Sequence, residues 1–383
     1  MSQAVLLVAT ATKWLGTARM PRILARAGFR VGLLAPDGAL ALRSRFLDEV
    51  GVVSNTAIPI EWLSMLIRMI DKVAPQMLVP CDEMAVRLLF LLVLDPPPGL
   101  KPELRATLGT LVQHSLGDRA FYATSIDKTL LPAAASALGV RVPPHAVVAR
   151  AAEAIAFAEQ CGYPVVLKRR FGFAGDGNAI VNSPEELRQA VQRLLRPDQL
   201  DLGEHALPQL LVQGYITGAH HSQALVALNG VPLAGFAWDR FVATRSIAGQ
   251  TTVLRFVDSP ETRMFSEKLG RGFGLSGFFN AQFIVEAATG AAHLLEINRR
   301  IVTHMHLGER VGADLGVALY RALSGASPMP APPLDPAAGN AVVVFPRQWL
   351  SDPESRYLTE YPVDVPWDEP ELIQAMLAMR HDG

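Results

Sequence analysis

The first part of the chain alternates short apolar runs with stretches of helical periodicity. This alternation is typical of βα units that form a parallel sheet. The expected strands are Val5–Ala9, Val31–Ala35, Val52–Val53 and Met77–Pro80. The expected helices are Thr17–Ala27, which Gly28 would end, and Glu61–Val73. Residues 1–118 therefore predict a small, open, Rossmann-like α/β domain.

The pattern changes near residue 119 and indicates an α+β region. A helix that contains Lys128 and ends at Gly139 leads into longer hairpin strands. A proline-rich linker begins near Ser324, and a strand at Ala341–Phe345 and a short helix at Pro370–Met379 follow it. We therefore expect three segments, namely 1–118, 119–325 and a linker with a C-terminal extension at 326–383.

Composition and charge exclude several classes of protein. The 383 residues suit two or three domains, and a formal net charge of −1 gives no basic field for nucleic acid or an anionic membrane. The longest apolar run, Leu88–Leu94, is far shorter than a membrane span, and Ala4–Ala9 is better interpreted as a buried strand than as a signal peptide. Cys81 and Cys161 have no disulfide or zinc spacing, so we expect a cytoplasmic protein.

Two sequence blocks carry candidate chemistry, and the first is a strand, a glycine loop and a second strand. Lys168 ends the first strand, and Gly172, Gly175 and Gly177 follow it. Backbone N–H groups in such a loop can surround an anion, and the lysine supplies a charge for phosphate oxygens. A hairpin with a mobile turn is the alternative. The turn after the first strand, Thr10–Gly16, lacks both common phosphate-loop patterns, so no dinucleotide site is expected there.

The second block is a hairpin with oxygen ligands on both strands. If Gly290 takes the left-handed position of a three-residue loop, Gln282 falls opposite Glu296 and Asn280 opposite Asn298. One carboxylate with amide oxygens suits Mg²⁺ when phosphates complete its coordination. Arg300 lies on the same face and could hold a terminal phosphate. A solvated surface hairpin is the alternative interpretation.

In this order, the two blocks resemble the ATP-grasp superfamily over residues 119–323, with a pre-ATP-grasp α/β domain in front. The metal motif is most similar to the carbamoyl-phosphate-synthetase-like branch. The resemblance implies Gln282, Glu296 and Asn298 as metal ligands, and Lys168 and Arg300 as catalytic residues. It also implies a nucleotide site made by Lys128, Lys168, Gly172, Gly175, Gly177, Gln213, Gly214, Tyr215, Ile216 and His220.

Three positions depart from the family pattern. Gly214 stands where glutamate is frequent, but the main chain reads adenine there. His220 lies in the segment that usually carries an acidic residue for the ribose, and a histidine can still bond to a hydroxyl group. Arg299 replaces the usual proline and would add charge near the phosphates.

The candidate substrate residues are less specific. Glu83 follows a strand of the front domain at the sheet edge where ligands commonly bind, although the neighbouring Asp82 could simply cap a helix. Arginines near residue 250 could recognise a carboxylate or be solvated; they are Arg240, Arg245 and Arg255. His304 and His306 lack a third zinc ligand and are expected to pack or to line a substrate site.

The resemblance implies an ATP-dependent ligase that activates a carboxylate as an acyl phosphate and joins it to an amine. ATP and Mg²⁺ are the expected cofactors, with Mn²⁺ as a substitute ion. The expected partners are small-molecule carboxylate and amine substrates, without nucleic acid or membrane; a homodimer is compatible with this interpretation. The alternatives are a bicarbonate-activating enzyme and an ATP-binding module without turnover.

Overall fold

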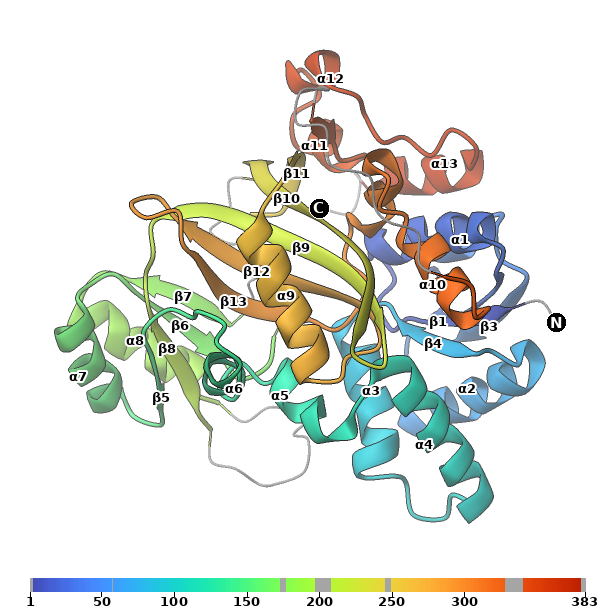
Figure 1. Cartoon of the computed structure of the whole chain (residues 1–383), viewed down its shortest axis with the longest axis horizontal. Helices are drawn as coiled ribbons and strands as arrows, with labels where there is room; N and C mark the ends of the chain where they lie inside the picture. The colour runs from blue at the N-terminus through green and yellow to red at the C-terminus, as the bar shows by residue number, and fades with distance from the viewer. Residues whose placement is uncertain are drawn as a thin grey trace.

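The computed structural model describes residues 3–56, 58–172, 177–196, 208–244, 249–327 and 340–379. Its described strands form three sheets (Figure 1). A parallel sheet belongs to the front domain, a small antiparallel sheet forms one lobe, and a six-stranded antiparallel sheet lies between them. The expected α/β and α+β regions are thus both present.

The front sheet is parallel and has the strand order β3-β2-β1-β4. Its strands are β1 (Ala4–Val8), β2 (Arg30–Pro36), β3 (Glu49–Val53) and β4 (Met77–Pro80). The helices are α1 (Leu15–Ala27), η1 (Leu40–Arg43), α2 (Pro59–Val73), α3 (Glu83–Leu94) and α4 (Pro102–Leu116). Gly28 ends α1 with φ 108°, a left-handed conformation that glycine adopts without steric cost. The predicted open α/β arrangement is confirmed.

The connection from the front domain consists of short helices. They are η2 (Arg119–Phe121), α5 (Tyr122–Ile126) and α6 (Leu131–Ala137). The prediction that Lys128 lies within a helix is wrong, because this residue occupies the turn between α5 and α6. The reason is local: the Asp127 side chain accepts hydrogen bonds from the backbone N–H and hydroxyl of Thr129, at 2.8 and 2.6 Å, and so stabilises the turn.

The small lobe contains the strand–glycine–strand block. Its sheet has the order β5-β8-β6-β7, from β5 (His145–Val148), β6 (Val165–Arg169), β7 (Asn178–Val181) and β8 (Leu210–Gly214). Helices α7 (Ala151–Cys161) and α8 (Pro184–Leu194) pack on one face and share a core with the strands. The Ser183 hydroxyl accepts a bond from the Glu186 N–H and thereby caps α8.

The large sheet carries the second sequence block. Its order is β13-β12-β9-β10-β11-β14. The strands are β9 (Gly218–Leu228), β10 (Val231–Ala243), β11 (Thr251–Val257), β12 (Gly277–Glu286), β13 (Ala292–Asn298) and β14 (Ala341–Val343). Helix α9 (Pro260–Gly272) covers one face, where Phe265 packs with Phe279 and Phe283. The opposite face shares a core with the front domain, including Trp238 and Leu24.

The C-terminal segment joins the large sheet to the front domain. After η3 (Met305–Val311) and α10 (Leu315–Leu323), β14 pairs with β11, and α11 (Arg347–Ser351), α12 (Tyr357–Glu360) and α13 (Pro370–Ala378) follow. Helix α13 lies near α1 in Figure 1, and Asp368 just before it pairs with Arg22 at 2.9 Å and with Arg26 at 3.0 Å. The predicted strand and terminal helix are confirmed. Among the described helices, none is long and apolar enough to cross a bilayer.

Candidate functional site

The β12–β13 hairpin has the register expected from the sequence. Gln282 pairs with Glu296 and Asn280 with Asn298, and Gly290 adopts φ 73° in the loop. The register shifts after Gln282, so that Leu295 is an extra residue on β13. Its carbonyl oxygen accepts a 3.4 Å hydrogen bond from the Lys168 Nζ. The two sequence blocks therefore meet at this bulge.

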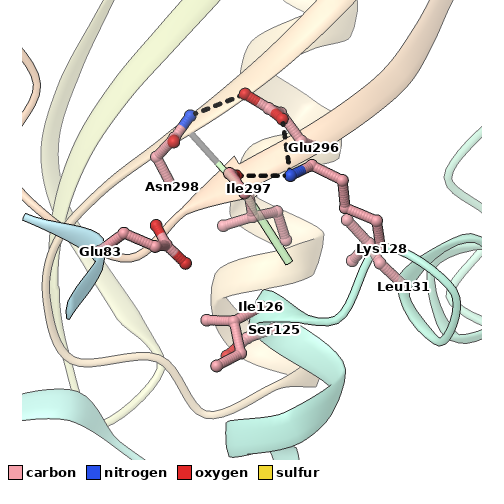
Figure 2. Close-up of a pocket in the computed structure, with 9 residues that line it drawn as sticks. Glu83, Ser125, Ile126, Lys128, Leu131, Glu296, Ile297 and Asn298 are labelled. Atoms are coloured by element: carbon pink, nitrogen blue, oxygen red, sulfur yellow. Dashed lines mark hydrogen bonds and ion pairs between the residues drawn. The ribbon is translucent and has the colours of Figure 1, made fainter. Parts of the chain in front are cut away.

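Charged and amide groups line a pocket around Glu296 (Figure 2). The Lys128 Nζ lies 3.9 Å from the Glu296 Oε2 and donates a 2.7 Å hydrogen bond to the Gly172 carbonyl. The Asn298 Nδ2 donates to the Glu296 Oε1 at 3.4 Å. Glu83 from the front domain also lines the pocket. The hairpin, the glycine loop and the front domain thus contribute to one site.

The front domain positions Glu83 through its neighbour Asp82. The Asp82 carboxylate caps α3 by accepting from the Ala85 N–H at 2.9 Å. It also accepts from the Thr10 N–H at 2.6 Å and the Ala11 N–H at 2.9 Å, which ties the β1–α1 loop to the start of α3. Asp82 therefore fills the capping role considered from the sequence, and Glu83 is the residue directed at the site.

Arg300 joins the front domain to the end of β13. Its Nε lies 3.5 Å from the Glu83 Oε2, and its guanidinium carbon lies 4.8 Å from the centroid of the Trp14 ring. The Trp14 indole donates to the Ile301 carbonyl at 3.2 Å. Sequence analysis missed Trp14 because the Thr10–Gly16 turn was considered only for phosphate motifs. Its large aromatic side chain beside a strand end was the available signal.

Burial and neighbouring charges set the pKa values of the ionisable groups at the site. Burial opposes ionisation of Glu296, but Lys128 and Lys168 outweigh it and keep the pKa of this carboxyl below its ordinary value. Burial lowers the pKa of Lys168 to about 8. Burial also raises the pKa of Glu83, although the positive charge of Arg300 opposes this change. The pocket therefore combines an anionic Glu296 with lysines that are ready to receive phosphate charge.

The residues around Glu296 fit a magnesium ion. Asn280 is buried, and its Oδ1 has no hydrogen-bond partner in the described structure, while it shares a sheet face with Asn298. Gln282 and Glu296 lie opposite each other on the same face. Within the described ranges, no group of three or more His, Cys, Asp or Glu side chains could hold a metal. One carboxylate with amide oxygens is the donor set that suits Mg²⁺ with phosphate rather than Zn²⁺.

The expected nucleotide residues occupy the edge between the small lobe and the large sheet. Gln213 and Gly214 end β8, Gln213 is buried, and the Tyr215 side chain is partly exposed. Ile216 lies in the short connection to β9. His220 lies on β9 opposite Ile284, on the face that carries Gln282.

Burial is the main influence on His220, and together with the nearby Arg240 and Lys168 it lowers the pKa of this imidazole to about 4. Its ring is therefore neutral at pH 7. A neutral imidazole can accept a hydrogen bond from a hydroxyl group.

The glycine loop lies only partly within the described residues. Gly172 and Gly177 both have positive φ, and Gly172 presents its carbonyl oxygen to Lys128. At Gly177 a Cβ atom would approach the Arg169 side chain to 3.0 Å. Gly175 lies outside the described residues.

The two candidate substrate arginines that the structure describes, Arg240 and Arg255, do not lie together. Arg240 lies on β10 on the face shared with Trp238, whereas Arg255 pairs with Asp239 on the opposite face, at 3.1 Å between Nε and Oδ2. Strand alternation explains this separation. Arg240 and Arg255 therefore face opposite sides of the sheet, and the Arg255 side chain is half exposed. Arg245 lies outside the described residues.

Arg299 does not add charge to the phosphate site, contrary to the sequence-based expectation. Its guanidinium is buried and donates to the Leu116 carbonyl, to the Ser125 hydroxyl at 3.2 Å and to the Ser276 carbonyl at 3.5 Å. Burial lowers the pKa of Arg299 to about 10. The side chain joins the end of α4 to α5 and to the start of β12, so its role is structural.

His304 and His306 are buried, as packing or substrate-lining residues would be. The His306 Nε2 lies 2.8 Å from the Asp364 Oδ2, whereas His304 lies edge-on to Trp238 with 5.4 Å between ring centroids. Arg347 on α11 donates to the Thr303 hydroxyl at 3.1 Å. Sequence analysis missed Arg347 because its segment showed no motif.

Comparisons with known proteins agree with this geometry. The sequence model of the family "Carbamoyl-phosphate synthase L chain, ATP binding domain" matches residues 127–228. A D-alanine–D-alanine ligase from Geobacter sulfurreducens is 29% identical over 179 residues, which are 46% of this chain and 55% of that protein. The arginine-specific carbamoyl phosphate synthase large chain of Geobacillus stearothermophilus is 22% identical over 55% of this chain. The chain spans only 21% of the synthase and about half of the ligase.

Solved structures share the fold over most of the chain. Biotin carboxylase from Campylobacter jejuni superposes with a TM-score of 0.63 at 16% identity, and covers 86% of this chain and 72% of its own. N5-carboxyaminoimidazole synthetase from Staphylococcus aureus gives 0.62 at 13% identity, with 85% and 78% covered. Residues 127–228 thus resemble an ATP-binding domain of the ATP-grasp type, and most of the chain shares the fold of these solved structures.

Proposed function

We propose that this protein is an ATP- and Mg²⁺-dependent ligase that joins a carboxylate to an amine with release of ADP and phosphate. The approach of Lys128 to Glu296 and of Arg300 to Glu83, two carboxylates that line the same pocket, is the observation that carries this proposal. The partly buried Glu296 carboxylate, with cations and amides around it, suits the phosphates of a magnesium nucleotide. The partial match to the family model and the similarity to a D-alanine–D-alanine ligase support the same reaction class.

The proposed reaction has two steps, phosphorylation of the carboxylate and attack by the amine. A carboxylate oxygen of the first substrate attacks the γ-phosphorus of ATP, the P–O bond to ADP breaks, and an acyl phosphate forms. The amine nitrogen of the second substrate then attacks the acyl carbon, phosphate leaves with the C–O bonding electrons, and the nitrogen loses a proton. Positioning and charge neutralisation supply most of the catalysis in such transfers.

Each group in the pocket has a distinct task in these steps. Lys128 and Lys168 neutralise the nucleotide phosphates, and Arg300 holds the phosphoryl group during transfer. Gln282, Glu296 and Asn298 would hold Mg²⁺, which supplies positive charge at the phosphate oxygens when bound. We assign the adenine to the Gln213–Ile216 backbone and a ribose hydroxyl to the neutral His220. No nucleophilic side chain is required.

The test is release of ADP and phosphate from Mg·ATP with amino acids and small carboxylates added singly and in pairs. Stimulation by a pair would identify both substrates, and Mn²⁺ in place of Mg²⁺ should retain activity. Lys168→Ala and Glu296→Ala should each lower turnover about 10²–10³-fold. Lys72→Ala, which removes an exposed lysine on α2, is the matched control. Near-wild-type turnover in both site variants would disprove the assignment.

Bicarbonate activation is the second candidate, because the matched family model describes a carbamoyl-phosphate synthase domain and one solved neighbour of similar fold was determined with MgADP and bicarbonate. Incorporation of labelled bicarbonate into product would favour it. ATP binding without ADP release from any substrate combination would instead indicate the non-catalytic module. A cytoplasmic location and a homodimer belong to the leading proposal and can be tested by fractionation and light scattering.

A further inference from the structure

A second group of basic side chains lies beside the proposed phosphate site. We call Arg240, His304 and Arg347 the basic cluster. Arg240 projects from the same face of β10 as Trp238, because the two residues are two positions apart. Trp238 pairs with Ser222, and Ser222 pairs with Gln282 of the proposed metal site. The cluster and the Glu296 pocket therefore share one face of the large sheet.

The strand that carries the metal ligands leads directly into this cluster. Arg300 is followed within four residues by His304, whose ring lies edge-on to Trp238. The hydroxyl of the adjacent Thr303 accepts a 3.1 Å hydrogen bond from the Arg347 Nη2. The C-terminal segment therefore brings an arginine to the loop that begins at the proposed phosphate ligand.

Two nitrogen atoms of the basic cluster make no hydrogen bond to the described residues. The His304 Nε2 and the Arg347 Nε are buried and have no partner among the described residues. Burial is the main cause that drives the pKa of His304 well below its ordinary value, and the charges of Arg347 and Arg240 add to it. Asp364 is the acidic group that influences Arg347, but it also accepts hydrogen bonds from His306 and from the Phe345 N–H. Unpartnered buried polar groups are rare in native proteins, and a bound ion or a catalytic role is among the explanations for them.

The spacing of the strands sets the distance that a ligand must cover. Three strand intervals separate β13, which carries Glu296, from β10, which carries Arg240. At about 4.8 Å per interval, the two backbones lie roughly 14 Å apart. Arg240 interacts electrostatically with Glu296, so its side chain reaches toward the pocket, and a small organic molecule can span the remaining distance. Bicarbonate, with only one anionic centre, could not occupy both positions.

We propose that the basic cluster binds an oxyanion group of an organic substrate, a carboxylate or a phosphate, distinct from the carboxylate that is phosphorylated. Arg347 and Arg240 pair with the oxyanion, the neutral His304 completes its hydrogen bonds, and Trp238 forms an apolar wall. This inference rests on the proposed ligase function and narrows its substrates to pairs in which at least one molecule carries a second anionic group. It also assigns a role to the C-terminal segment.

The test begins with equilibrium binding, which does not depend on turnover. Succinate and glycerol phosphate are titrated calorimetrically into the wild-type protein, Arg347→Gln, Arg347→Lys and the control Arg356→Gln, whose side chain is exposed. We expect saturable binding that weakens at least tenfold in Arg347→Gln, recovers partly in Arg347→Lys and is unchanged in Arg356→Gln. The preferred probe distinguishes a carboxylate from a phosphate. Equal affinities in the wild type and a folded Arg347→Gln would overturn the inference.

A kinetic experiment separates this inference from the proposed function. For any substrate pair that stimulates ADP release, the anionic group that is not phosphorylated is replaced by its neutral amide or ester. We expect the KM of the wild-type enzyme to rise at least tenfold, whereas that of Arg347→Gln should change less than threefold. ADP release that is insensitive to this replacement in the wild type would overturn the basic cluster while leaving the ligase function intact. Absence of ADP release with every pair would count against the ligase itself.

Discussion

Replacing Arg299 by methionine should destabilise the protein, because this side chain joins three segments of the core. Arg299 donates to two backbone carbonyls and one hydroxyl, and methionine would leave the carbonyls of Leu116 and Ser276 without this donor. Each buried acceptor left unsatisfied costs about 1–3 kcal/mol. The Ser125 hydroxyl loses less, since it also donates to the Tyr122 carbonyl at 2.9 Å.

An opposing term reduces the expected effect. Burial lowers the pKa of Arg299 to about 10, which corresponds to a cost of about 3 kcal/mol for keeping the guanidinium charged. Methionine removes this cost and fills a similar volume. However, the arginine also packs three segments together, and methionine cannot bond to any of them. We therefore expect a net loss of up to about 3 kcal/mol in the free energy of unfolding.

The assay is urea unfolding followed by both tryptophan fluorescence and circular dichroism, since coincident transitions are needed to extract a free energy. Arg188→Met is the control: this exposed arginine pairs with Glu185 on α8, and its loss should change the free energy of unfolding by less than about 0.5 kcal/mol. An Arg299→Met variant that is as stable as the wild type, or more stable, would show that the cost of the buried charge exceeds the contribution of its hydrogen bonds.

Two further predictions concern a titration and a steric contact. Lys168 has a pKa of about 8, so its ammonium form predominates below pH 8 and is lost as the pH rises; log kcat/KM for ATP should fall with a slope near −1 above that pH, and Lys168→Arg should remove this limb. A decline that persists in the arginine variant would exclude Lys168 as its source. At Gly214 a Cβ atom would lie 2.7 Å from the Cys161 Sγ, so Gly214→Ala should lower the free energy of unfolding by about 1 kcal/mol, and much less in a Cys161→Ala background. Equal losses in the two backgrounds, measured by urea unfolding, would contradict that contact.

Local pattern predicted the elements of the front domain and the hairpin register well. Gly28 and the alternation along β12 and β13 are short-range features, and they determine where a helix ends and which side chains share a face. The sequence could not place Arg347 beside Thr303, because that contact depends on how distant segments pack. The position of Lys128 was predicted wrongly because the Asp127 side chain bonds to the backbone of its own turn, as a helix-capping side chain does. An assignment of helix from residue propensity alone does not detect such a local bond.

The alternation of side chains along a strand explains why Arg240 and Arg255 lie on opposite faces of the sheet. Once both residues are assigned to neighbouring strands, alternation decides their faces, but the register of β10 with β11 contains shifts near Val242 that no turn motif reveals. Arg299 shows the converse case. The position of Arg299 next to the phosphate motif suggested a phosphate contact. Because Asn298 and Arg300 on either side of it face the site, the Arg299 side chain points into the core instead.

The pairing of β14 with β11 affects the order in which the protein can fold during synthesis. The β12–β13 hairpin ends at residue 298, but the sheet edge at β11 stays uncovered until residues beyond 340 have left the ribosome. Arg347 and Asp368, whose carboxylate pairs with Arg22 of α1, are synthesised later still. The proposed nucleotide pocket can therefore form before the basic cluster does, so a nascent chain would acquire the proposed phosphate site first and the proposed second anion site last. Domains that fold during synthesis commonly acquire structure from the N-terminus onward. In this chain the final strand, β14, must be made before the basic cluster can be complete.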